Sequence, residues 1–290
     1  MRGSHNYLKA ETFMMQKTFS TSTLFRRHLA LPQDHGSWVF LLSPLLIGLF
    51  AGGRWSGTSF WVVLGAFAGF LIRQPILVWI KILAKRKARR DLSTALFWMM
   101  VYGFIGLVAV IGLVTSGVGY VLWLVVPALP VFVWYLALVY RRAERRQMGV
   151  EIVGSGTLAL AAAAAYWVGK GEMSSIGWWL WVLTWLQSAA SIVYAYLRLE
   201  QRVWTQAQNA RERVRVGSRA ALYATFNLVG SAILSVLGWF SPWLWLPYLV
   251  QWGETIWGIT HPAMGVKPTS IGFRQLAVSV LFTVVFIIVW

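Results

Sequence analysis

Long apolar stretches separated by short polar ones follow one another from about residue 37 to the last residue. A helix needs about twenty apolar residues to cross the hydrocarbon core of a bilayer, and a chain within lipid must satisfy its own backbone hydrogen bonds. The pattern therefore predicts an all-α membrane protein with about nine transmembrane helices. The alternation of apolar and polar residues that is typical of a membrane barrel is absent. We expect the helices near residues 37–53, 58–80, 92–114, 119–140, 151–169, 175–197, 217–238, 241–260 and 271–290.

The polar, basic start of the chain contrasts with this apolar remainder. We divide the sequence into a basic N-terminal segment, residues 1–31, and a single polytopic transmembrane domain, residues 32–290. The N-terminal segment has no apolar core before a small-residue cleavage site, so no secretory signal is expected there. Met14 and Met15 leave a later translation start open.

Composition supports the membrane assignment, because 58% of the residues are hydrophobic, 12% are charged and the mean hydropathy is +0.62. A soluble domain is closer to half apolar and about a quarter charged. The net charge of +17 would suit nucleic-acid binding, but its placement does not. Of the 26 Lys and Arg residues, 23 fall in the N-terminal segment and in every second loop or the helix ends beside it. We therefore expect no nucleic-acid partner.

The same distribution of charge predicts an orientation. Loops that are rich in Lys and Arg stay in the cytoplasm, so the N-terminus is expected inside and the C-terminus outside. The basic clusters then serve topology and contact lipid headgroups, or alternatively recognise an anionic substrate. The longest basic loop contains residues 201–215, which we expect to form a polar helix at the interface.

Residues with metal-binding or redox chemistry are scarce. The chain has no cysteine, which excludes disulfides, thiolate metal sites and Cys nucleophiles. Its four histidines, His5, His28, His35 and His261, are not clustered in the sequence. We expect neither a metal site nor a cofactor.

Polar residues within or at the edge of the predicted spans are the candidate functional residues, because such groups are costly in a membrane. Arg73 lies inside the second predicted helix, close to Pro75, which interrupts helical hydrogen bonding. It either snorkels to the inner face or lines a cavity. We expect nine such residues to line an inward-facing cavity: Asp34, His35, Arg73, Gln74, Gln187, Asn227, Gln251, Glu254 and His261.

Glu254 is the sharpest of these candidates, because no other acidic residue lies well inside a predicted span. At that depth its carboxyl group would be neutral or paired. We expect Arg73 to be its ion-pair partner, with Gln251 or Asn227 as hydrogen-bond donors. A structural ion pair and a ligand or proton site are both consistent with the sequence.

The stretch Pro32-Gln33-Asp34-His35-Gly36-Ser37-Trp38 directly precedes the first apolar run. It resembles the Pro-x-Glu-His-Gly-Ala-Trp motif of the YwiC-like family of bacterial membrane proteins, with Asp34 in place of the glutamate and Ser37 in place of the alanine. The segment Gly265–Gln275 also resembles that family. The resemblance implies a multi-pass protein of the bacterial cytoplasmic (inner) membrane, but the family has no established activity to carry over.

A more distant resemblance is to the UbiA-type intramembrane prenyltransferases. It rests on nine helices, a cytoplasmic N-terminus and polar positions near the inner ends of the second and sixth helices. The family carries Asp-rich motifs at those two places, which hold magnesium ions and a prenyl diphosphate. Here they read Arg73–Trp79 and Gln187–Ser191, and the whole chain has two aspartates, Asp34 and Asp91. The resemblance therefore implies a UbiA-like helical bundle without magnesium-dependent prenyl transfer.

Three functions remain open at the level of sequence. The first is binding of an isoprenoid, a quinone-like molecule or another membrane lipid in an intramembrane cavity, with or without transfer chemistry. The second is transport of a small solute or of protons, for which Arg73, Glu254 and the interrupted helices would form the path. The third is a non-catalytic subunit of a membrane complex, which would require a protein partner.

Overall fold

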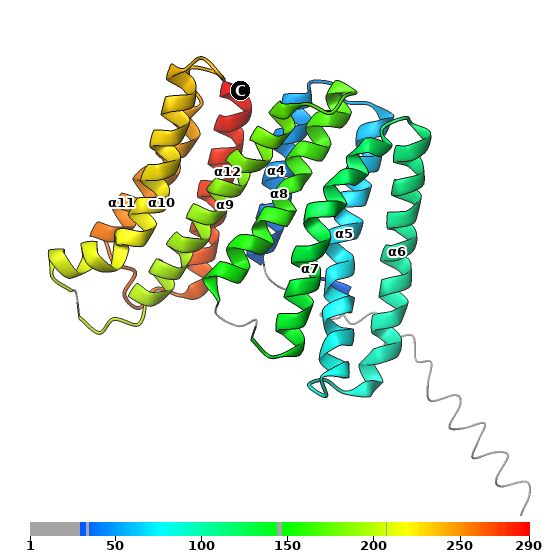
Figure 1. The fold of residues 1–290 in the computed structure, drawn as a ribbon. Coiled ribbons are helices and arrows are strands. Elements are labelled where there is room, and N and C mark those ends of the chain that lie inside the picture. The colour runs from blue at the N-terminus through cyan, green and yellow to red at the C-terminus, as the bar shows by residue number, and fades with distance from the viewer. Residues whose placement is uncertain (1–29, 33–34, 144–146, 207) are drawn as a thin grey trace, which may run out of the picture.

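Helices make up all of the regular structure in the part of the chain that the computed structural model describes, which is residues 30–32, 35–143, 147–206 and 208–290. Within these ranges there are nine α-helices and no strand. Two 3₁₀ helices, η1 (Arg89–Asp91) and η2 (Gly119–Leu124), precede α6 and α7. The α-helices are α4 (His35–Gly52), α5 (Gly57–Leu83), α6 (Leu92–Thr115), α7 (Val125–Tyr140), α8 (Met148–Lys170), α9 (Ser175–Gln201), α10 (Ala210–Val236), α11 (Trp245–Thr260) and α12 (Pro268–Val289) (Figure 1).

Seven segments are long and apolar enough to cross a membrane: α5, α6 with η1, α7 with η2, α8, α9, α10 and α12. Helix α4 is apolar over residues 36–52 but shorter. These helices have the length and composition of a multi-pass membrane protein. Each of the nine predicted segments overlaps an α-helix, so the all-α part of the prediction is confirmed for the described residues. Seven of these segments, not nine, are long and apolar enough to cross a membrane.

Two local predictions need correction. The fourth predicted span, residues 119–140, is not one α-helix, because its first turns form η2. The expected interfacial helix over residues 201–215 is wrong: α9 extends to Gln201, residues 202–206 are not helical, and α10 begins at Ala210. The Oδ1 atom of Asn209 accepts a hydrogen bond of 2.8 Å from the backbone N–H of Glu212, which caps α10 at this point.

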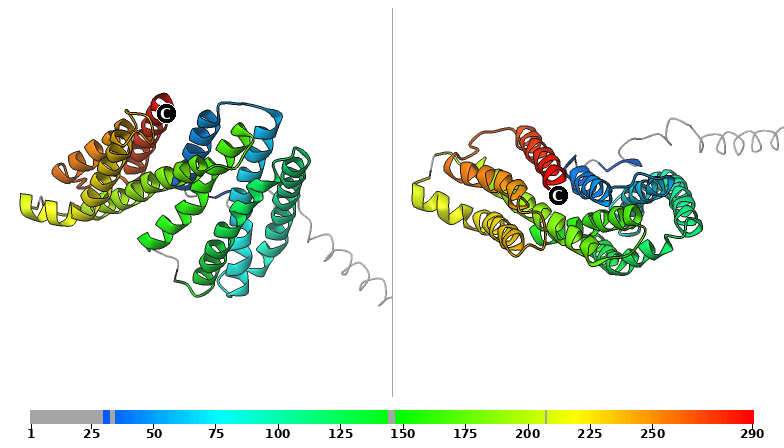
Figure 2. Two further views of the ribbon diagram at one scale, coloured as in Figure 1. Left: turned by 45° about the horizontal axis from the view of Figure 1, so that its top comes forward. Right: turned by 90° about the horizontal axis from the view of Figure 1, so that it is seen from above.

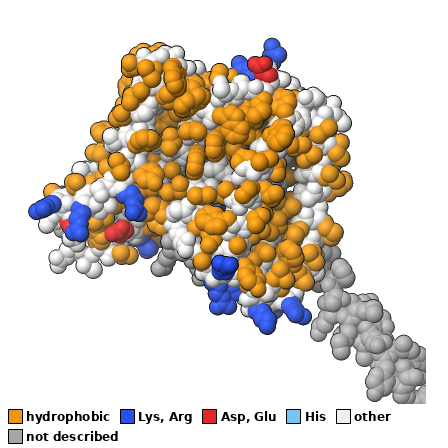
Figure 3. Space-filling model, in the orientation of Figure 1, with side chains coloured by type: hydrophobic (Ala, Val, Ile, Leu, Met, Phe, Trp, Pro, Cys, Tyr) orange, Lys and Arg blue, Asp and Glu red, His pale blue; other side chains and the backbone are white. Residues whose placement is uncertain are grey.

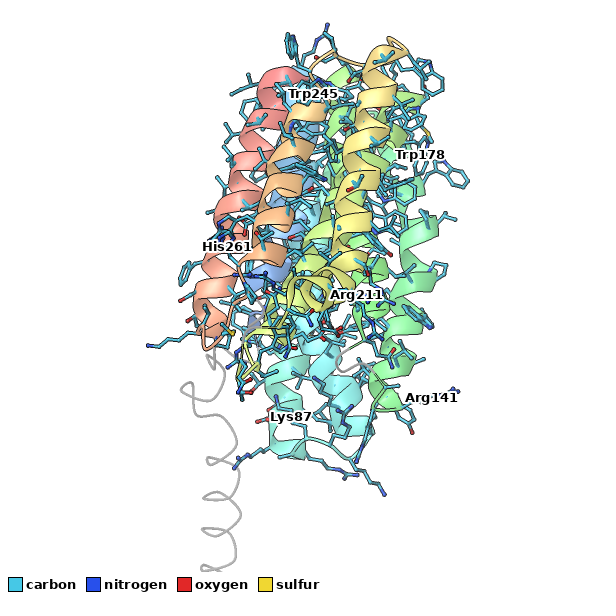
Figure 4. The ribbon with its side chains drawn as sticks, turned by 90° about the vertical axis from the view of Figure 1, so that its left-hand side faces the viewer. Lys87, Arg141, Trp178, Arg211, Trp245 and His261 are labelled. Atoms are coloured by element: carbon cyan, nitrogen blue, oxygen red, sulfur yellow. The ribbon has the colours of Figure 1, made fainter. Side chains whose placement is uncertain are left out.

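The helices run up and down, so their connections alternate between two ends (Figure 1). We call the end with the polar connections near residues 84–91, 141–143, 202–206 and 261–267 the basic end. Apolar side chains cover the middle of the visible face in Figure 3, and Lys and Arg gather along its lower edge. In Figure 4, Lys87 and Arg141 lie toward that edge, whereas Trp178 and Trp245 lie toward the upper end. This separation suits a helical bundle with one strongly cationic interface.

Helices α4, α8 and α9 form the centre of the bundle. Helices α5 to α7 lie on one side of them and α10 to α12 on the other (Figure 2). In the most apolar part of α9, 67% of the residues are buried, against 11% in α7, so α9 is a central helix and α7 a peripheral one. Helix α9 contacts α8 and α4 on one side and α10, α11 and α12 on the other.

Small residues let α4 and α8 approach closely. A Cβ atom added at Gly48 would overlap the carbonyl group of Ala162, and one added at Gly169 would lie 2.7 Å from the Cα atom of Gly52. Such backbone contacts are a common way to join helices in lipid, where dispersion contacts matter more than apolar burial. The α4–α8 pair therefore forms a rigid wall for the site described next.

Candidate functional site

A large cavity of about 1030 Å³ lies between α4, α5, α6, η2, α7 and α8. Small residues keep it open. Gly69 of α5 and Gly154 of α8 both line it, and a Cβ atom added at either position would meet no other side chain or neighbouring backbone within 4 Å. Ligand sites in proteins generally occupy about 300–1,000 Å³, so the cavity is large enough for an elongated molecule.

The wall of the large cavity changes from apolar to polar along the helices. At the end opposite the basic one it is formed by residues such as Val62, Leu113, Val121 and Ala164. Along α5 the wall continues from Val62 to Arg73, which is about 16 Å at 1.5 Å per residue. The cavity is therefore long and apolar, with its charged residues nearer the basic end.

Arg73 supplies the positive charge of this wall. Its guanidinium carbon lies 5.9 Å from the ring centre of Phe70 and 5.8 Å from that of Tyr135. Its Nε atom is buried and has no hydrogen-bond partner, and no carboxylate of the described residues forms an ion pair with it. Arg73 thus lines the large cavity, and its neighbour Gln74 lies half-buried on the same helix.

Glu151 is the acidic residue of the cavity wall, and it lies in the first turn of α8. A carboxylate is favourable there because the N-terminus of a helix carries a partial positive charge. The hydroxyl group of Tyr196 donates a hydrogen bond of 2.7 Å to Oε1 of Glu151. Glu151 is thus held to α9 by its side chain.

Glu254 lies elsewhere, at a small cavity of about 280 Å³ between α9, α11 and α12. The Nε and Nη2 atoms of Arg274 donate to its two oxygens over 2.6 and 2.8 Å, and the hydroxyl group of Tyr194 donates over 2.7 Å. Arg274 also stacks on Trp257, with 3.6 Å from the guanidinium carbon to the ring centre. The predicted pairing of Glu254 with Arg73 is therefore wrong.

The expected hydrogen bonds from Gln251 and Asn227 to Glu254 are also not made. Gln251 accepts a bond of 3.0 Å from Gln187 and donates one of 3.3 Å to Thr255, all within the buried interface of α9 and α11. The amide of Asn227 donates to the backbone carbonyl of Leu186 over 2.8 Å. These buried amides hold helices together, as expected for polar groups in a helical membrane bundle.

Of the remaining candidates, His35 and His261 lie at the basic end. His261 ends α11, stacks on Trp257 with ring centres 5.0 Å apart, and lines neither cavity. His35 begins α4, but its side chain is not described. Asp34 lies outside the described residues. The structure thus places Arg73 and Glu254 at two separate cavities and does not bring the described candidates to a single one.

Sequence reasoning missed two residues that fix the ends of α9 and α11. Arg198 is 6% exposed, and its Nη1 atom donates to the carbonyl oxygens of Gly258 and His261 over 2.8 and 2.6 Å. Gln201 is completely buried and donates to the same Gly258 oxygen over 3.1 Å. Free carbonyls at a helix C-terminus are often satisfied in this way. The predicted span ends at residue 197, which leaves Arg198 outside the helix, whereas α9 continues to Gln201.

No group of three or more His, Asp or Glu side chains that could hold a metal ion is found within residues 30–32, 35–143, 147–206 and 208–290. The large cavity offers one guanidinium and one carboxylate, and the small cavity offers a carboxylate that is already bound to an arginine. Neither arrangement is a magnesium site, which needs several oxygen ligands.

Comparison with known proteins concerns the part of the chain that forms the large cavity. Residues 31–166 match the YwiC-like protein family. The chain is also 23% identical to the uncharacterized protein YwiC of Bacillus subtilis (strain 168) over 172 residues, which are 59% of this chain and 68% of that protein. These matches support the resemblance to the YwiC-like family, and the family match begins directly before Pro32. No solved structure matches the chain.

The YwiC-like match and the large cavity occupy the same part of the chain. All residues that line the cavity lie between Gly36 and Ala164, within the matched range. The small cavity and the segment Gly265–Gln275 lie outside it. The cavity is therefore formed by the part of the molecule that resembles the family.

Proposed function

We propose that this protein binds a lipid-like amphiphile, such as an isoprenoid or a quinone-like molecule, in the large cavity that is lined by helices α4 to α8. The single observation that supports this proposal is the long apolar wall with charged residues toward one end. An amphiphile has the same distribution of apolar and polar groups. Its chain would contact residues such as Val62 and Leu113, and its polar end would lie near Arg73 and Glu151.

We further propose that the whole chain is of the YwiC-like type and lies in the bacterial cytoplasmic membrane, with its N-terminus inside and its C-terminus outside. The helix count and the single basic end support this orientation.

A UbiA-like arrangement stays a prediction based on that helix count. Binding without magnesium-dependent transfer is the simplest proposal, since Glu151 is the one carboxylate of the cavity wall among the residues that the structure describes. Transport and a role as subunit of a membrane complex also stay predictions.

The proposal is tested by filling the cavity. Leucine at both Gly69 and Gly154 would place two bulky side chains in the cavity, and their Cβ atoms would meet no neighbouring atom within 4 Å. Lipids that copurify with the wild-type protein under gentle conditions would be identified by mass spectrometry. We expect an amphiphile in near-stoichiometric amount with the wild-type protein, and its loss from the G69L/G154L variant.

The matched control is Gly230→Leu in α10, which also adds a side chain where no atom lies within 4 Å but lines neither cavity. It should retain the bound molecule. Equal retention by the cavity-filled protein and the wild type would overturn the proposed function.

A further inference from the structure

Arg73 has a positive charge in the wall of the large cavity, and no carboxylate among the residues that the structure describes forms an ion pair with it. Two other arginines that lie within the helices and are bound by protein groups, Arg198 and Arg274, differ in this respect. Arg274 forms a two-point ion pair with Glu254, and Arg198 donates to two backbone carbonyls. The Nε atom of Arg73 is buried without a partner, and its aromatic neighbours, Phe70 and Tyr135, are nearly 6 Å away. A charge at this depth is costly unless it is paired.

From this geometry we infer that the molecule bound in the large cavity is anionic, and that its carboxylate or phosphate group binds Arg73. This inference rests on the proposed function and adds the chemical class of the ligand. A guanidinium group binds carboxylates and phosphates through parallel hydrogen bonds, which makes arginine well suited to such a group. An anion at this place would accept a bond from the unpartnered Nε atom and neutralise the charge.

The surroundings of Arg73 are compatible with an anion. Gly36 and Ser37, in the first turn of α4, line the same cavity, and the N-terminus of a helix favours negative charge. Glu151 is the acidic residue among the lining residues, but it is exposed and accepts the hydrogen bond of Tyr196. It therefore leaves the charge of Arg73 unbalanced.

The inference is tested with probes that share one tail and differ in the head group: dodecyl phosphate, dodecanoate, dodecanol and dodecyltrimethylammonium. Binding to the protein in phosphatidylcholine nanodiscs would be measured by native mass spectrometry. We expect one or both anionic probes to bind the wild-type protein about tenfold or more tightly than dodecanol, because charge-assisted hydrogen bonds are roughly twice as strong as neutral ones. The two anions distinguish a phosphate ligand from a carboxylate ligand.

Variants then assign the preference to one residue. Arg73→Gln should reduce binding of the anionic probes to the level of dodecanol, and Arg73→Lys should retain part of the preference because it keeps the charge. Arg90→Gln removes an exposed cation that lines neither cavity. It should leave the binding of all four probes unchanged. If the Arg73→Gln protein does not fold, comparing the binding of the four probes to the wild type and to Arg73→Lys still tests whether the site prefers an anionic head group.

The outcomes separate this inference from the proposed function. Equal binding of the anions and dodecanol to the wild type, or an unchanged preference in Arg73→Gln, would overturn the assignment of an anionic ligand. The proposal that the large cavity is the binding site would still hold after that result if the G69L/G154L variant bound none of the four probes. Probe binding that is insensitive to cavity filling would instead overturn the proposed function.

Discussion

Single residues decide how charge is accommodated inside this bundle. Glu254 needed a partner on energetic grounds, and the sequence correctly suggested that it would be paired or neutral. The sequence did not identify Arg274 as the partner. Helix α12 begins at Pro268, so Arg274 lies more than one turn inside it and reaches Glu254 on α11. Which residues face each other across two helices depends on packing, which a hydropathy pattern does not contain.

The ion pair of Glu254 predicts a measurable contribution to stability. Glu254→Gln leaves Arg274 without its counter-charge, and we expect the free energy of unfolding to fall by about 1–3 kcal/mol. The effect is smaller than for a fully buried pair because the Arg274 side chain is 43% exposed. Thermal unfolding in detergent, followed by tryptophan fluorescence, measures it.

A matched control for that prediction exists on α10. Glu212 pairs with Arg215 over 3.6 Å, and their side chains are 39% and 81% exposed. Glu212→Gln should therefore cost only about 0–1 kcal/mol. Equal destabilisation by the two substitutions would show that the Glu254–Arg274 contact has no special role.

Contacts between helices determine where the large cavity forms. The sequence predicted the helices well, because about twenty apolar residues between polar loops leave little choice of structure in a membrane. It did not predict the cavity, which arises where small residues of several helices, among them Gly69 and Gly154, face a common space. The same residue types close the α4–α8 contact at Gly48 and Gly169. Only the arrangement of the helices distinguishes these two roles of glycine.

This difference between glycines can be tested on α4. In Gly48→Val, the new side chain would overlap the carbonyl group of Ala162, so α4 and α8 must separate. We expect a loss of about 1–3 kcal/mol or more, as for other overpacked cores. The control Gly230→Val also replaces a helical glycine but meets no atom within 4 Å. The melting temperatures of the two variants in detergent measure the difference; identical values would contradict the close approach of α4 and α8.

The molecule as a whole is polarised, with its cationic loops at one end (Figure 3). Basic loops are retained in the cytoplasm, so this end is expected to face the cytosol. Some of these cationic side chains also hold helix ends in place. The side chain of Arg86 donates to the carbonyl oxygen of Val139 at the end of α7, and that of Arg213 donates to Thr260 at the end of α11. The sequence predicted the polarity from counts of residues, but not that some of these arginines bind helix ends.

The orientation can be measured with single cysteines, because the chain contains none. Ser116, between α6 and η2, and Thr205, between α9 and α10, are both exposed and lie at opposite ends. In intact cells a membrane-impermeant maleimide should label Ser116→Cys and not Thr205→Cys. Permeabilised cells provide the control, in which both should react. The reverse pattern in intact cells would contradict the proposed topology.

The position of the large cavity in the chain has a consequence for biosynthesis. Its walls are complete at Ala164, so every wall helix leaves the ribosome before α9 does. At about 5–20 residues per second, synthesis of the remaining helices takes on the order of ten seconds. A ligand in the surrounding bilayer can therefore meet its binding walls during translation, and its capture would help the first five helices assemble before the last four arrive.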